Sequence, residues 1–386
     1  MRIFGFHLMP WPYLTADDIA NSDSSWVTMS NALYDPVKGH ELYETYFNQL
    51  VMYDRVGFDG VSVNEHHQTA YGLMPSANVT AAMLIPQVKG MIAILGNALP
   101  LQANPLKIAE EVAYLDVVSG GRIISGFVRG IGAEYHSISM DPSTSRDRFY
   151  EAHDLVIKAW TDPGPFEWYG KHYKFRYVNP WPRPFQQPHP PIWSPSQGSA
   201  ETVEWAAKNK YVYLQTFSDT KSCERIFAEL QEAQVRHHGQ VMSEYAGWSV
   251  PVYVGDTDES AIREAKPHIE HLFNDLLRMR RDQLFPAGYL TVESTSRVMS
   301  AKAKGLGIGR KTCEQLIESG IVIVGSADTV RDTIVERQRS FGFGNFSGIF
   351  HFGTLPNELF EASLTRFARH VLPTVRMLGT PALVTD

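Results

Sequence analysis

Four consecutive side chains that can donate, accept or titrate lie near the start of the chain, at the end of an apolar run. The stretch VSVNEHHQTAYG begins at Val61 and places Asn64, Glu65, His66 and His67 there. Imidazole titrates near neutral pH, so a histidine at this place suits general acid or base catalysis. The alternative is a histidine that orders a loop by hydrogen bonding and transfers no proton.

Polar side chains also end other segments that are expected to be strands. They are His7, Asn97, Arg129, Gln215 with Thr216, and His351. Because the carboxyl ends of parallel strands in a barrel meet at one mouth, their recurrence predicts a polar-lined pocket there. Each of them taken alone is equally compatible with a structural role.

A metal ion or a serine nucleophile is not expected. His66 and His67 are adjacent, so in an extended strand they point to opposite faces and cannot both reach one ion. The spacings HxH and HExxH are absent, and no GxSxG elbow is present to carry a serine nucleophile.

A second stretch, SPSQGSAETVEWAAK (194–208), is suited to holding an anion. Gly198 and Ser199 precede an expected helix, and Thr202 lies one turn further on. Free backbone N–H groups and the helix dipole make such a start a natural phosphate seat, to which Arg129 could add a charge-assisted contact. The alternatives are an ordinary capped helix and an arginine that forms a salt bridge at the rim.

The elements that must position these residues alternate along the chain. Strands are expected at 2–8, 60–64, 91–99, 122–130, 190–194, 211–217, 248–254 and 346–353. Helices are expected at 41–57, 78–88, 145–160, 199–209, 219–238 and 357–378, and another begins near Pro105 and ends before Gly120. About eight βα units predict an α/β fold, a (β/α)8 TIM barrel, and the lack of GxGxxG after the first strand weakens the open-sheet alternative.

Two regions interrupt the alternation within what is expected to be a single domain, 1–386. Residues 161–191 are rich in proline and aromatic residues and predict a loop that carries a hairpin. Residues 255–320 predict an insertion between strands seven and eight, with helical pieces at 259–282 and the glycine- and lysine-rich AKAKGLGIGRKT. Residues 321–342 are expected to form a loop and a helix.

Composition narrows the classes of function. The chain has 386 residues, 44% hydrophobic and 20% charged, with a net charge of −7. That charge argues against a nucleic-acid partner, since binding phosphates needs an excess of Lys and Arg. Cys223 and Cys313 form neither a CxxC pair nor a disulfide framework, which fits a cytoplasmic protein. No apolar run approaches the roughly 20 residues of a membrane helix.

Several motifs together resemble the bacterial luciferase-like flavin monooxygenases. They are NEHHQTAYGLMPSANVTAAM, NPLKIAEEVAYLDVVSGGRIISGFVRG, SRDRFYEAHDLVIKAW, GSAETVEWAAK and VGSADTVRD, and they run nearly end to end. The resemblance implies a TIM barrel that takes reduced FMN from a separate flavin reductase. With O2 this flavin would form a C4a-hydroperoxide that oxygenates a small organic substrate. A homodimer is expected on the same ground.

The resemblance also implies roles for individual residues. It implies a catalytic His66 with His67 beside it, and a flavin phosphate held by Arg129, Arg146, Gly198, Ser199 and Thr202. It places Asn97 at the flavin, with a cis peptide bond between Gly96 and Asn97, and a mobile lid at 266–315. Val128 stands where luciferases carry a reactive cysteine, so light emission is not expected.

The substrate side is less defined. Met9, Trp11, Tyr71, Leu73 and Met74 are expected to line an apolar pocket near the flavin, or else to be packing residues. Two other functions stay open: an F420-dependent hydride transferase on the same barrel, and a flavin-binding protein without turnover.

Overall fold

Eight parallel strands close into a barrel in the computed structural model, which describes residues 1–291 and 309–378. The strands of the barrel are β1 (Arg2–His7), β2 (Gly60–Asn64), β3 (Met91–Ala98), β4 (Ile123–Val128), β7 (Ile192–Ser196), β8 (Val212–Thr216), β9 (Ala246–Gly255) and β11 (Asn345–His351). They pair in chain order, and the pairing of β1 with β11 closes the circle. The predicted (β/α)8 barrel and its eight strands are therefore confirmed.

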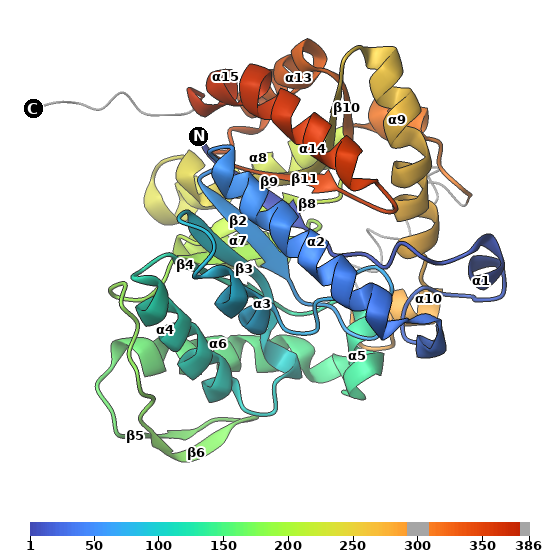
Figure 1. Cartoon of the computed structure of the whole chain (residues 1–386). Helices are drawn as coiled ribbons and strands as arrows, with labels where there is room; N and C mark the ends of the chain where they lie inside the picture. Colours follow the sequence, from blue (N-terminus) through green and yellow to red (C-terminus); the bar gives the residue numbers. More distant parts are fainter. Residues whose placement is uncertain (292–308, 379–386) are drawn as a thin grey trace, which may run out of the picture.

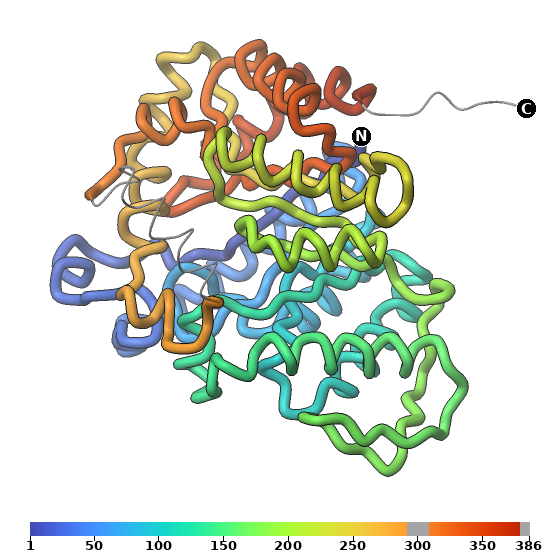
Figure 2. Tube along the Cα trace, turned by 180° about the vertical axis from the view of Figure 1, so that it is seen from behind, coloured from blue at the N-terminus to red at the C-terminus, as the bar shows by residue number. Residues whose placement is uncertain are grey.

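Helices surround the barrel (Figures 1 and 2). They are α1 (Ala16–Ala20), α2 (Pro36–Arg55), α3 (Ala77–Leu84), α4 (Pro105–Ser119), α5 (Gly132–Ile138), α6 (Ser145–Thr161), α7 (Ala200–Asn209), α8 (Thr220–His238), α9 (Asp258–His271), α10 (Arg281–Leu284), α12 (Cys313–Ser319), α13 (Ala327–Phe341), α14 (Asn357–Arg366) and α15 (Leu372–Arg376). Seen from behind, α7 and α8 lie side by side on the outer surface. The N-terminal ammonium group of Met1 donates to the carbonyls of Arg376 and Leu378, so both ends of the described chain meet.

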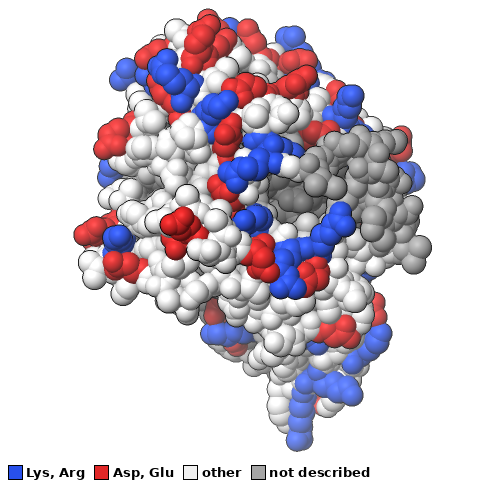
Figure 3. Space-filling view, turned by 90° about the vertical axis from the view of Figure 1, so that its right-hand side faces the viewer, with Lys and Arg blue, Asp and Glu red and all other residues white. Residues whose placement is uncertain are grey.

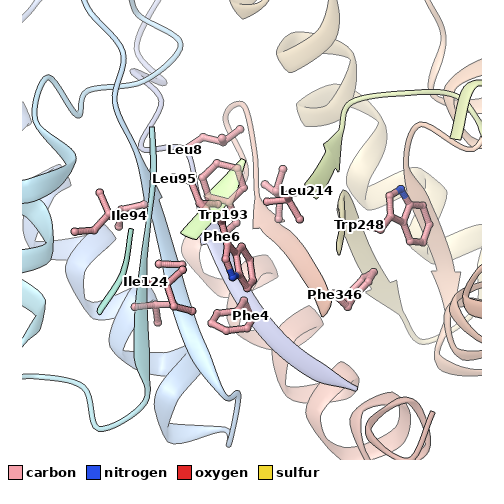
Figure 4. Packing of buried hydrophobic residues seen from close by; sticks show 14 of the residues in the cluster. Phe4, Phe6, Leu8, Ile94, Leu95, Ile124, Trp193, Leu214, Trp248 and Phe346 are labelled. Carbon is pink, nitrogen blue, oxygen red and sulfur yellow. The ribbon is translucent and has the colours of Figure 1, made fainter. Parts of the chain in front are cut away.

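The interior of the barrel is filled by large side chains that alternate along the strands. Phe4 of β1 packs edge-on against Trp193 of β7, with ring centroids 4.8 Å apart (Figure 4). Gly5, between Phe4 and Phe6, faces the other way, because a Cβ atom there would lie 2.2 Å from the ring of Tyr53 in α2. Period-two alternation thus sends one face of β1 into the barrel and the other against a helix.

Local signals set the helix boundaries. In α2 the Asp35 side chain accepts from the backbone N–H groups of Val37 and Lys38, so this helix begins earlier than its apolar spacing predicted. In α4 Pro105 occupies the first turn and Gly120 ends the helix in the left-handed region, at φ +67°. The predicted asymmetry of proline at the start and glycine past the end is confirmed.

Two regions outside the barrel strands differ in how far they were predictable. The hairpin expected within 161–191 is present as β5 (Phe166–Tyr169) and β6 (Lys174–Val178). Residues expected to be a loop instead contain strand β10 (Ile323–Ser326), which pairs with the carboxyl-terminal half of β9. A short apolar run such as IVIVG has no periodicity from which a strand could be recognised.

The insertion after β9 contains α9, a π-helical turn (Leu272–Leu276), α10 and α12 among the described residues. Residues 292–308 lie outside the described part. The predicted lid at 266–315 includes these residues, and it stays a prediction.

The expected cis peptide between Gly96 and Asn97 is wrong: this bond is trans. The strand instead accommodates an irregularity here, with Gly96 at φ +141° and a register shift between Ile94 and Asn97 against β4. Glycine adopts such a φ without steric strain, whereas a non-prolyl cis bond costs several kcal/mol. Gly126 of β4 lies against this stretch, where a Cβ atom would be 2.1 Å from the carbonyl oxygen of Ile94.

Candidate active site

His66 lies just after β2 and is paired with a carboxylate from another part of the chain. Its Nδ1 is 2.8 Å from Oε1 of Glu134 in α5, and the other carboxylate oxygen accepts from the backbone N–H of Ile131 at 2.9 Å. The Glu134 side chain is only 3% exposed. A carboxylate accepts only, so Nδ1 of His66 is the donor of this hydrogen bond, and Nε2 has no partner among the described residues.

His66 lines a cavity of about 720 Å³. Its described lining is mostly apolar or aromatic: Trp11, Leu14, Val27, Met29, Ser30, Asn31, Leu33, Tyr34, Tyr43, His66, Gln68, Thr69, Ala70, Gly72, Leu73 and Pro75. Trp11 packs against Tyr34 with ring centroids 4.6 Å apart. No Asp, Glu, Lys or Arg of the described residues lines this cavity. It suits a small organic molecule with an apolar body.

The predicted pocket residues divide into two groups. Trp11 and Leu73 line the cavity. Met9, Tyr71 and Met74 are buried outside its lining. Tyr71 packs against both Trp26 and His66, so it supports the histidine from behind.

His67 lies beside His66 after the end of β2 and has a different carboxylate partner. Its Nε2 is 3.2 Å from Oε1 of Glu65, and this hydrogen bond raises the pKa of His67 above its usual value despite partial burial. His67 is not in the lining of the cavity. Of the two histidines, only His66 lines the cavity.

A second group of polar side chains gathers at the start of α7. The Ser199 hydroxyl donates to Glu201 Oε2 at 2.8 Å, and Arg146 of α6 lies 3.2 Å from Glu201 Oε1. Burial opposes ionisation of Glu201, but its own backbone N–H, Ser199, Arg146 and Arg129 lower the pKa of its carboxyl group below the usual value. Three predicted phosphate ligands, Arg129, Arg146 and Ser199, therefore act on one anionic group.

Arg129 is held firmly in this group. Its Nη1 donates to the Ser145 hydroxyl at 3.2 Å and to the Tyr289 carbonyl at 2.7 Å, and its guanidinium lies 4.0 Å from the centre of the Tyr289 ring. A guanidinium that is already oriented loses little freedom when it binds an anion.

The backbone before α7 has a conformation that would allow a ligand to approach its N–H groups closely. Gly198 has φ +99°, and its N–H and that of Ser199 point to the Ser196 hydroxyl at 3.3 and 3.4 Å. Ser199 occupies the N-cap position as expected, although its hydroxyl binds Glu201 and accepts from no helix N–H. Thr202 lies in the first turn, with its N–H on the Ser199 carbonyl.

Two buried amides at the ends of neighbouring strands have acceptors without partners. Asn97 donates to Asn78 Oδ1 at 3.2 Å, but its own Oδ1 has no partner, and the same holds for Oδ1 of Asn64. A buried polar atom of this kind calls for a partner, so both oxygens remain able to accept a hydrogen bond.

His7 and His351, two further polar strand ends, have structural roles. The rings stack with centroids 5.0 Å apart, and both are buried. His7 accepts from the Met9 N–H and lies 2.6 Å from Gln49 Oε1. Burial lowers the pKa of His7 to about 4 and that of His351 well below 6.5. Both are therefore neutral at physiological pH.

The face of the molecule that carries α1 and α10 presents Lys and Arg side chains interspersed with Asp and Glu (Figure 3). Helix α10 adjoins α5, which carries Glu134, since a Cβ atom on Gly132 would lie 2.3 Å from the Leu284 carbonyl. Within 1–291 and 309–378, no group of three His, Cys, Asp or Glu side chains could hold a metal. In the same ranges, no helix is long and apolar enough to cross a bilayer.

Sequence reasoning missed Glu134 and Glu201. Glu134 follows the glycine-rich RGIGA after β4, and Glu201 lies in the first turn of α7. A carboxylate at a helix start is usually a favourable partner of the helix dipole, so neither stands out locally. The signal that could have found Glu134 is its place after a strand end at the same mouth as His66.

Comparison with known proteins points to one family. Residues 27–343 match the family model described as luciferase-like monooxygenase. Similar relatives include the uncharacterized protein y4wF of Sinorhizobium fredii (26% identity, 82% of this chain and 88% of the relative). They also include an FMNH2-dependent dimethylsulfone monooxygenase of Pseudomonas putida (24%, 84% and 86%). The alpha chain of an alkanal monooxygenase from Photorhabdus luminescens matches over about half of each chain (30%, 50% and 51%).

Solved structures show the same fold at low sequence identity. Monooxygenase RslO1 of Streptomyces bottropensis superposes with a TM-score of 0.71 (21% identity, 97% of this chain and 99% of that chain). The oxygenating constituent of 3,6-diketocamphane monooxygenase from Pseudomonas putida, solved with FMN, has a TM-score of 0.68 (20%, 97% and 99%). An F420-dependent secondary alcohol dehydrogenase has a TM-score of 0.66 (16%, 97% and 99%).

Proposed function

Because this chain belongs to the luciferase-like monooxygenase family, we propose that it is a flavin-dependent monooxygenase. It uses reduced FMN, delivered by a separate flavin reductase, and O2 to oxygenate a small organic substrate. The observation that carries this proposal is a pair of sites at one mouth of the barrel. One is the pair of His66 and Glu134 at an apolar cavity. The other is the group of Arg129, Arg146 and Ser199 at the start of α7, which we call the anion seat.

The residues present fit FMN. Arg129 and Arg146 match the charge of a phosphate monoester, and Ser199 adds a hydroxyl donor at a helix start. The unpartnered oxygens of Asn64 and Asn97 suit a ring that carries N–H donors. These residues would hold the cofactor, and reduced FMN would supply the two electrons with which O2 is activated.

His66 is the catalytic residue of the proposal. Nδ1 is tied to Glu134, so Nε2 is the atom that takes up or returns a proton at the cavity wall. Trp11 and the apolar residues around it offer water few hydrogen-bonding partners at that wall, which would help to protect a reactive intermediate from hydrolysis. The substrate class that fits is a small, largely apolar molecule.

An F420-dependent hydride transferase is the second candidate, favoured by the likeness to the secondary alcohol dehydrogenase. Reduced FMN is preferred because a relative described as FMNH2-dependent matches across 84% of this chain. The two are separated by measuring binding of FMN and F420 side by side, together with oxygen uptake. Tight F420 binding with substrate oxidation and no oxygen uptake would replace the proposal.

His66→Asn tests the proposed role directly. The purified protein is supplied with a flavin reductase, NADH, FMN and a panel of neutral substrates, and products are identified by mass spectrometry. We expect product formation to fall at least about 100-fold, the usual scale of lost acid–base catalysis, with FMN binding retained. Unchanged product formation in a folded variant would show that His66 only orders its loop.

A further inference from the structure

Glu201 holds the donors that the proposed phosphate site would need. Both of its carboxylate oxygens are engaged: Oε2 accepts from the Ser199 hydroxyl at 2.8 Å, and Oε1 lies 3.2 Å from Arg146 Nη2. Glu201 is also within the electrostatic reach of Arg129, which helps to lower the pKa of its carboxyl group together with nearer partners and against burial. At neutral pH the anion seat is therefore already occupied by an anion of the protein itself, the Glu201 carboxylate.

That anion and a bound phosphate cannot share the seat. A hydroxyl has one hydrogen, so Ser199 can donate either to Glu201 or to a phosphate oxygen. Arg146 would face two acceptors, and a carboxylate next to a phosphate dianion is strongly repelled. Binding of a phosphate therefore requires Glu201 to leave both partners.

Glu201 is able to leave. Its side chain is 31% exposed, so it can turn toward solvent without opening the core. It lies in the first turn of α7, where Ser199, one of its two partners, is two residues away on the same segment. Rotation of one side chain is enough to free the Ser199 hydroxyl and the Arg146 guanidinium.

We propose that Glu201 is a built-in competitor for the phosphate group of the cofactor. This inference rests on the proposed use of FMN. When no flavin is bound, the carboxylate keeps the seat neutralised and its donors ordered. When FMN enters, the carboxylate is displaced, which weakens flavin binding and speeds its release. In an enzyme that takes reduced flavin from a separate reductase, such release returns the spent cofactor for the next cycle.

Glu201→Gln tests the competitor role, because it keeps the shape and removes the charge. The matched control is Glu204→Gln, one turn further along α7, where Glu204 pairs with Arg236 and His237 on the outer side. Dissociation constants of FMN and riboflavin are measured by flavin fluorescence, and that of inorganic phosphate by calorimetry. Thermal melting checks that both variants are folded.

We expect Glu201→Gln to bind FMN and inorganic phosphate about tenfold more tightly than the unchanged protein, as for one lost charge repulsion. Riboflavin, which has no phosphate, should bind equally to all three proteins, and Glu204→Gln should behave as the unchanged protein. Equal or weaker binding of both phosphate ligands by Glu201→Gln would overturn the inference. If no protein binds FMN but Glu201→Gln still binds phosphate more tightly, the proposed cofactor fails and the competitor role stands.

Discussion

The two neighbouring histidines after β2 differ in how firmly a carboxylate partner fixes the orientation of the ring. Both have a largely buried carboxylate within 3.2 Å, but only Glu134 is held at its second oxygen by a backbone N–H. A carboxylate fixed in this way holds the ring of His66 in one orientation and one tautomer. Glu134 is therefore a positioning residue, which acts through His66.

At the residue scale, Glu134→Gln should lower turnover and leave binding intact. An amide can still accept from His66 but no longer stabilises the imidazolium, so we expect kcat to fall about 10- to 100-fold with KM and FMN affinity unchanged. Glu65→Gln, which alters the partner of His67, is the matched control and should change kcat little. Steady-state kinetics of both variants make the test, and an equal loss in both would argue against a specific role of Glu134.

At the scale of elements, one buried cluster connects three of them. His7 of β1 stacks on His351 of β11, and its Nε2 lies 2.6 Å from Gln49 in α2. These contacts tie the strand pair that closes the barrel to the first long helix. The cluster tolerates only neutral rings, because burial lowers the pKa of both histidines.

This cluster predicts an acid-sensitive fold. The pKa of His7 is about 4 in the folded chain and near 6.5 in the unfolded chain, so the unfolded state takes up the proton first as pH falls. The free energy of unfolding should therefore decrease as pH drops from 6.5 to 4, by roughly 3 kcal/mol from His7 alone.

Urea unfolding at several pH values, with His7→Gln compared with the unchanged protein, measures this effect. The variant should be less stable at pH 7 and should lose less stability on acidification. His40→Gln, a change at an exposed histidine of α2, should keep the full acid dependence. Identical pH dependence of all three proteins would contradict the assignment.

At the scale of the whole molecule, one face of the helical layer is unusually apolar. Val79 and Met83 of α3, and Tyr114, Val117 and Val118 of α4, are each at least 41% exposed. The two helices pack against each other, and the spacing within each puts its exposed residues on one side. Exposed apolar side chains on two neighbouring helices are typical of a contact surface, and we propose that they form the interface of the expected homodimer.

Met83→Glu and Val118→Glu should convert that dimer to a monomer, since each buries an unpaired charge in the contact. Val235→Glu, at an exposed position of α8, is the control and should leave the dimer intact. Light scattering during size-exclusion chromatography gives the mass of each protein. A monomeric unchanged protein, or a dimer that survives both helix changes, would exclude this interface.

The alternation of strands and helices, the hairpin and the polar strand ends could all be predicted from sequence, because they rest on local periodicity and turn chemistry. The resemblance predicted that Arg129, Arg146 and Ser199 hold a flavin phosphate, which stays a prediction, and in the structure all three act on the Glu201 carboxylate. The pocket was predictable only in part: Trp11 lines it, whereas Met9, Tyr71 and Met74 support it from behind.

What the sequence by itself determined is the order of βα units and which strands end in polar residues. Only the tertiary structure decided that Glu134 meets His66 across 68 residues, that Glu201 takes the donors of the anion seat, and that Gly96 and Asn97 are joined by a trans bond. The physical reason is the separation along the sequence over which each kind of interaction acts. Propensity and pattern act between residues a few positions apart, whereas these contacts depend on how closure of the barrel brings distant strand ends together.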